Sequence, residues 1–105
     1  MKLEVGLGAR SDVAEIAEYI DLRTPGRGEL FIDAVEAGFK KIEDAPRIQP
    51  PTDDGPPEVE TRYHLLKGFR YRIVFAIHLE TAFVMAVGHV HRRADFWLDR
   101  LPDAI

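Results

Sequence analysis

The sequence predicts an α+β domain in which two N-terminal helices pack on one face of a mainly antiparallel sheet. Three observations predict this fold. Two early segments carry apolar residues at helical spacing, three later segments resemble strands joined by short turns, and one short strand-like segment precedes them all. The expected order is strand, helix, helix, strand, strand, strand.

Length and composition are those of an ordinary globular protein. The 105 residues, of which 46% are hydrophobic and 30% charged, suffice for a single domain spanning 1–105 with a modest core. There is no cysteine, so disulfides and thiolate catalysis are excluded and a reducing compartment is the expected one. Because the N-terminus does not resemble a signal peptide and the longest apolar run, 82–87, is short, we expect a cytoplasmic protein without membrane contact.

The N-terminal part predicts a strand and two helices. Residues 3–7 alternate loosely and form the expected first strand, which the glycines at 6 and 8 weaken. Ser11 is the expected N-cap of a first helix that ends near Arg23. Thr24 and Pro25 are typical of the start of a second helix, which Pro46 ends. The residues that would face the sheet follow the helical repeat: Val13, Ile16, Ala17, Ile20, Phe31, Val35, Phe39 and Ile42.

The C-terminal part predicts three strands after an irregular, proline-rich loop at 47–58. The strands are expected at 59–66, 69–78 and 82–91, with a two-residue hairpin loop, Lys67-Gly68, between the first two. Every odd position from 69 to 77 is apolar, so this face is expected to lie under the helices. The opposite face begins with Arg70 and Arg72 and is expected to remain partly open.

Charge is distributed unevenly along the chain. The formal net charge is −4 at pH 7, which is unlike a typical nucleic-acid-binding protein. Between positions 62 and 93, however, Glu80 is the one acid, and the basic residues are Arg62, Lys67, Arg70, Arg72, Arg92 and Arg93. A basic surface within an acidic chain is therefore compatible with this sequence.

Residues 88–97 concentrate most of the chemistry: two histidines, two arginines, an aspartate and the one tryptophan follow an apolar strand. Imidazole and guanidinium groups at a strand end suit a site that handles an anion or transfers a proton. The expected hairpin loops place Tyr63 opposite Arg72, and Arg72 opposite Gly88 or His89. We therefore predict that Tyr63, Arg72 and His89 meet on the uncovered face, with Arg92 and Arg93 at its rim.

These residues also have simpler interpretations. Arg70 and Arg72 are compatible with solvated strand residues, His89 with a hydrogen-bonded strand end, and Trp97 with a packing anchor for the C-terminal segment. Among the four histidines, only the pair His89 and His91 has a spacing that suits a metal ion. The sequence offers no comparable third ligand for this pair, so we expect no metal site. The chain has neither a phosphate-binding glycine loop nor a nucleophile elbow. We also expect no cofactor.

The order of three segments, 12–20, 69–75 and 87–93 followed by Phe96-Trp97, resembles the RelE/ParE superfamily of toxins from type II toxin–antitoxin systems. The resemblance spans nearly the whole chain. It implies a small cytoplasmic toxin that forms a hetero-oligomer with a cognate antitoxin, whose C-terminal segment would cover the open sheet face.

Within this superfamily, RelE-like members cut messenger RNA on the ribosome and ParE-like members inhibit DNA gyrase. The ribonuclease branch implies catalytic roles for four residues: His89 as acid or base, Arg72 and Arg92 as phosphate clamps, and Trp97 as the platform on which a base stacks. Tyr63, Arg70 and Arg93 would then bind the substrate around them.

The chain also departs from the ribonuclease pattern. The strand before the central one lacks the lysines of that branch, and Phe96-Trp97 stands where a C-terminal tyrosine is typical. The acidic composition is awkward for binding a ribosome. The first hypothesis is therefore ribosome-dependent messenger RNA cleavage, and the alternatives are a non-enzymatic gyrase inhibitor or an inactive relative that only binds its antitoxin.

Overall fold

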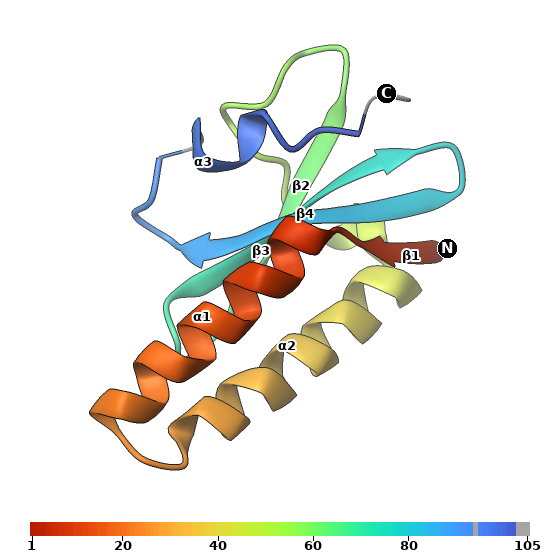
Figure 1. The fold of residues 1–105 in the computed structure, drawn as a ribbon. Coiled ribbons are helices and arrows are strands. Elements are labelled where there is room, and N and C mark those ends of the chain that lie inside the picture. The colour runs from red at the N-terminus through yellow and green to blue at the C-terminus, as the bar shows by residue number, and fades with distance from the viewer. Residues whose placement is uncertain (94, 103–105) are drawn as a thin grey trace.

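The computed structural model, which describes residues 1–93 and 95–102, has a four-stranded sheet with two long helices on one face (Figure 1). The elements are β1 (Lys2–Val5), α1 (Leu7–Arg23), α2 (Arg27–Asp44), the 3-10 turn η1 (Pro46–Ile48), β2 (Glu60–Leu66), β3 (Tyr71–His78), β4 (Thr81–His89) and α3 (Asp95–Leu98). The strand order is β1-β4-β3-β2, with β1 parallel to β4 and the other pairs antiparallel. The predicted α+β fold and element order are confirmed.

The core between helices and sheet uses the predicted apolar stripes. Phe31 and Val35 of α2 are buried against Ile73, Phe75 and Ile77 of β3, as the helical and alternating spacings predicted. Among the described residues, no helix combines the length and apolar character needed to cross a membrane.

The first helix begins earlier than predicted. The Gly6 N–H donates to the Val84 carbonyl over 2.9 Å, and the chain then turns directly into α1 at Leu7. A Cβ at position 6 would lie 3.1 Å from that carbonyl oxygen, so the close approach favours glycine. Ser11 lies inside α1 and does not cap it, because the pairing of β1 with β4 decides where the helix begins.

The β2–β3 hairpin has a longer loop than predicted. Leu66 pairs with Tyr71, which leaves a four-residue loop at 67–70, and Arg70 within it has a left-handed φ of 61°. Tyr63 therefore pairs with Val74 and not with Arg72, which corrects the predicted register. Because the shift is two residues, Tyr63 and Arg72 still lie on the same face.

A β-bulge in β4 changes which side chains face the helices. Phe75 pairs with Val84 but Val74 pairs with Ala86, so Met85 is an extra residue in β4. Beyond this point every β4 side chain points to the face opposite the one that unbroken alternation predicts. Gly88 lies opposite Arg72, which is one of the two predicted pairings, whereas His89 lies opposite Tyr71 and faces the helical side.

The face opposite the helices is more covered than predicted. A second buried cluster there consists of Val74, Ala76, Met85, Ala86 and Trp97, and α3 lies over it (Figure 1). The loop at 47–58 also covers part of the edge of β2, since the Thr52 N–H donates to the Thr61 carbonyl and the Tyr63 N–H donates to the Pro50 carbonyl, both over 3.0 Å. The end of this face next to the β2–β3 loop is open.

An ion pair joins α1, the bulge and the C-terminal segment. Asp12, which is buried, accepts hydrogen bonds from the Val87 N–H (3.0 Å) and from Arg100 Nη1 (2.6 Å). The same Arg100 nitrogen donates to the Met85 carbonyl over 3.3 Å. These two side chains thus satisfy backbone groups of β4 where β1 has ended and no neighbouring strand is available.

Candidate functional site

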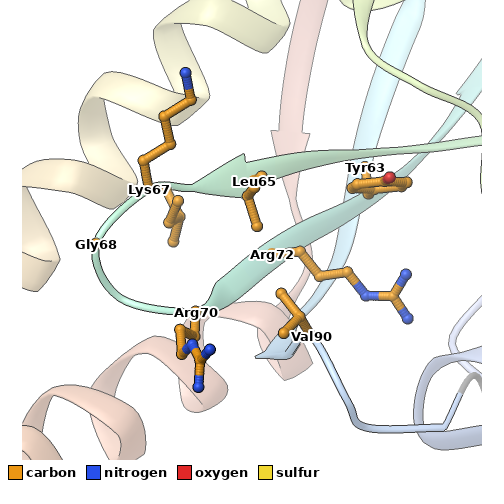
Figure 2. A pocket seen from close by; sticks show the side chains of 8 residues that line it. Tyr63, Leu65, Lys67, Gly68, Arg70, Arg72 and Val90 are labelled. Atoms are coloured by element: carbon orange, nitrogen blue, oxygen red, sulfur yellow. The ribbon is translucent and has the colours of Figure 1, made fainter.

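A cleft of about 540 Å³ opens at the uncovered end of the sheet (Figure 2). It is lined by the end of β2, the β2–β3 loop, the start of β3 and the end of β4: Tyr63, Leu65, Leu66, Lys67, Gly68, Arg70, Arg72 and Val90. Leu65 is 44% exposed and contributes apolar surface to this cleft. The cleft combines an apolar floor with three cationic side chains and suits an occupant that is both apolar and anionic.

Tyr63 and Arg72 are the part of the predicted site that the fold brings together. The Arg72 guanidinium carbon lies 5.5 Å from the centre of the Tyr63 ring, and Figure 2 shows both side chains on one side of the sheet. Arg72 Nε is buried and has no hydrogen-bond partner among the described residues. A buried donor without an acceptor is costly, so this nitrogen is suited to an acceptor supplied by a bound partner.

Arg70 connects this cleft to a second pocket. Its carbonyl accepts a hydrogen bond from the Val90 N–H over 3.0 Å, which fastens the end of β4 to the loop. Its side chain lines the cleft and also a second pocket of about 310 Å³ on the helical side. The left-handed backbone of a non-glycine residue at this junction is a local strain of the kind that concentrates at functional sites.

His89 lies in the second pocket and not beside Arg72, which contradicts the predicted cluster. Its ring packs edge-on against Tyr71, with the ring centres 5.5 Å apart, and lies 5.2 Å from the ring of His91. Burial raises the pKa of Tyr71 above its usual value, and Tyr19 adds to the shift, so this hydroxyl remains a hydrogen-bond donor. The bulge at Met85 is the physical reason for the changed position, because it turns His89 to the helical side.

The aromatic residues near the C-terminus serve packing. Trp97 is fully buried in the second cluster, so the prediction that it stacks on a nucleotide base is wrong and the packing-anchor interpretation is confirmed. Phe96 lies over Gly88, where any Cβ would collide with its ring. Arg92 lies over Phe96, with its guanidinium carbon 4.5 Å from the ring centre, whereas Arg93 is exposed.

The second pocket contains residues that the sequence did not single out. Tyr19, Arg23 and Arg27 line it together with Phe69 and His89. In the sequence Arg23 and Arg27 resemble ordinary helix-end residues flanking a turn, and only the fold shows that this turn lies against the β2–β3 loop. Within 1–93 and 95–102, no three histidine or carboxylate side chains are grouped as a metal site requires.

Residues 4–94 match a family model described as the ParE toxin of the type II toxin–antitoxin system parDE. This chain belongs to the ParE toxin family. The resemblance to the RelE/ParE superfamily is thereby confirmed, and the chain is a ParE-type toxin of a type II toxin–antitoxin system.

A solved structure agrees with the ParE assignment at the level of fold. A chain described as the chromosomal ParDE TA system from P. aeruginosa superposes with a TM-score of 0.72 at 13% sequence identity, covering 85% of this chain and 95% of that one. At this identity the likeness shows the fold alone. No curated protein matches the sequence.

Proposed function

We propose that this ParE-family toxin arrests growth by binding DNA gyrase, not by cleaving messenger RNA, and that a cognate antitoxin neutralises it. The observation that carries the proposal is the separation of Arg72 from His89 by the sheet: Arg72 lies with Tyr63 in the open cleft, and His89 lies with Tyr71 on the helical side.

This separation matters because RNA cleavage beside a 2′-hydroxyl needs its groups to converge. A general base must reach the hydroxyl, and the charge stabiliser must reach the same phosphate, both at hydrogen-bond distance of about 3 Å. Two side chains on opposite faces of a sheet do not contact one phosphate. The buried Trp97 cannot serve as the stacking platform either.

A toxin that acts by surface contact does not need such convergence. It needs a stable scaffold and an exposed recognition surface. This chain has a buried apolar cluster on each face of its sheet, and the cleft at one end of the sheet exposes both cationic and apolar side chains. Membership of the ParE family supports gyrase as the proposed target, because ParE-like members are the gyrase-directed branch of the superfamily.

The open cleft also supports a partner role for the antitoxin. Leu65 and Val90 offer apolar contact, Arg72 Nε lacks an acceptor among the described residues, and the edge of β2 beyond Tyr63 is not covered by the 50–52 segment. An extended antitoxin segment with alternating apolar and acidic side chains fits these features. We infer a hetero-oligomeric toxin–antitoxin complex in which this segment occupies the cleft.

Two assays on the purified chain test the target. We expect inhibition of gyrase-catalysed supercoiling of a relaxed plasmid, reversed by an equimolar amount of the cognate antitoxin, and intact messenger RNA on programmed ribosomes. Ribosome-dependent RNA fragments that disappear in Arg72→Ala would overturn the proposal, since the RNA-cleaving alternative requires this arginine.

A further inference from the structure

One end of the molecule carries cations without acidic partners. The salt bridges of the described residues involve Lys2, Lys40, Arg47, Arg62 and Arg100, all of which lie elsewhere. The other nine cations form no salt bridge among the described residues, and five of these nine line the cleft or the second pocket: Arg23, Arg27, Lys67, Arg70 and Arg72. We call these five residues the basic end.

The fold builds the basic end from two distant segments. Arg27 at the start of α2 donates to the Gly68 carbonyl over 2.9 Å, which joins the helix turn to the β2–β3 loop. Arg23, Arg27 and Arg70 line the second pocket, while Arg70 also lines the cleft with Lys67 and Arg72. Figure 2 shows the Lys67 and Arg70 side chains leaving the loop in different directions, so the positive surface extends around the loop.

Aromatic rings lie among these cations. The Arg27 guanidinium carbon is 4.5 Å from the centre of the Phe69 ring, and Arg23 lies 5.4 Å from that of Tyr19, whose hydroxyl accepts its hydrogen bond. The nearby acid Asp21 accepts hydrogen bonds from the Gly26 and Gly28 N–H groups and so stabilises the turn. These aromatic contacts hold the arginines without neutralising them.

This arrangement matches a polyanion of regular charge spacing. Cations on both sides of one loop cover more surface than a single small anion contacts, and duplex DNA carries one charge per roughly 1.7 Å of its axis. Arginine on aromatic rings is a common donor to phosphate oxygens. Since the whole chain has a net charge of −4, the basic end also orients the toxin toward such a partner.

We propose that the basic end binds the phosphate backbone of double-stranded DNA. The biological setting, DNA held by gyrase, rests on the proposed function, but the contact itself does not. We expect this contact to be independent of the DNA sequence, because phosphate contacts carry no sequence information.

The test is the salt dependence of binding to a fluorescent duplex, followed by anisotropy with the full-length chain. If all five cations neutralise phosphates, the slope of log K against log salt is about −4.5. The triple variant Arg23→Gln, Lys67→Gln, Arg70→Asn is expected to reduce it to about −1.8. Asparagine is chosen at position 70 because it tolerates the left-handed backbone.

The matched control removes the same charge elsewhere, with Lys2→Gln, Lys40→Gln and Arg47→Gln, and should keep the wild-type slope. If the triple variant misfolds, Arg70→Asn alone is expected to reduce the slope by about 0.9. Equal slopes for the basic-end variants and the control would overturn the proposal. Binding of a polyglutamate peptide but not of the duplex would overturn it too, and would mark the basic end as a protein-docking surface.

These outcomes are independent of those for gyrase. If the chain inhibits supercoiling but the basic-end variants bind DNA with the wild-type salt slope, the proposed function is supported and the DNA-binding proposal is contradicted. If DNA binding shows the expected slopes but gyrase is not inhibited, the DNA-binding proposal is supported and the proposed function is contradicted.

Discussion

The Asp12–Arg100 pair gives the sharpest test of how the fold is held together. Asp12→Ala removes the acceptor of the buried Val87 N–H, and an unpartnered buried donor costs about 1–3 kcal/mol. It also removes the ionic hydrogen bond from Arg100, but that side chain is 31% exposed and regains water, so this loss is discounted. We expect the free energy of unfolding to fall by about 3 kcal/mol in total.

Two further variants separate the backbone contact from the charge. Asp12→Asn keeps an oxygen acceptor for the Val87 N–H and is expected to lose about 1 kcal/mol. Arg100→Met is expected to lose about 1–2 kcal/mol, because Asp12 then keeps one partner and gains access to water. In a double-mutant cycle that combines Asp12→Asn with Arg100→Met, we expect a coupling energy of about 1 kcal/mol.

Urea unfolding followed by fluorescence is a direct assay, because the chain has one tryptophan and it is fully buried beside the segment that Arg100 fastens. Backbone circular dichroism provides the comparison. An Asp12→Ala variant within about 0.5 kcal/mol of wild type, or an Asp12→Asn variant as unstable as Asp12→Ala, would contradict the role assigned to this carboxylate.

Three other predictions concern local structure. Gly88→Ala places a Cβ against the Phe96 ring, so we expect the free energy of unfolding in urea to fall by about 1–3 kcal/mol. Adding Phe96→Leu should restore part of this stability. A Gly88→Ala variant as stable as wild type would contradict this packing. Leu79→Gly relieves a φ of 53° at a residue that is 79% exposed, and thermal unfolding should show a gain of about 0.5–1 kcal/mol rather than a loss. Burial lowers the pKa of His64 below its ordinary value of 6.5, and Lys41 adds to the shift, so the unfolded chain binds this proton more readily. The stability that neutral His64 contributes is therefore present above about pH 6.5 and is lost as the pH falls through the folded-state pKa. His64→Gln should flatten the pH dependence of the unfolding free energy between about pH 7 and pH 5. An unchanged pH profile in this variant would exclude this role for His64.

The sequence predicted those features that depend on periodic burial. The apolar stripes of both helices and the odd face of β3 predicted the two layers correctly. Packing the helices on this face of the sheet buries both sets of side chains in one core, which includes Phe31, Val35, Ile73 and Phe75. The start of α1 escaped prediction because it depends on a tertiary hydrogen bond from Gly6 to Val84.

The predicted cluster of Tyr63, Arg72 and His89 is wrong for His89, and the cause is the β-bulge in β4. The bulge at Met85 falls inside the run 82–87, where every residue is apolar, so the alternation that would reveal a change of face is absent. The consequence is that His89 changes sides, while Tyr63 and Arg72 keep theirs because the longer β2–β3 loop shifts the register by two. The surroundings of Arg27 escaped notice because they come from a loop 41 residues away.

The proposed target is best measured by the topology of a reporter plasmid in cells induced to express this chain without its antitoxin. We expect the plasmid to lose negative supercoiling while its transcripts keep their full length. Normal supercoiling accompanied by transcripts cut within their translated regions would contradict gyrase inhibition and favour messenger RNA cleavage.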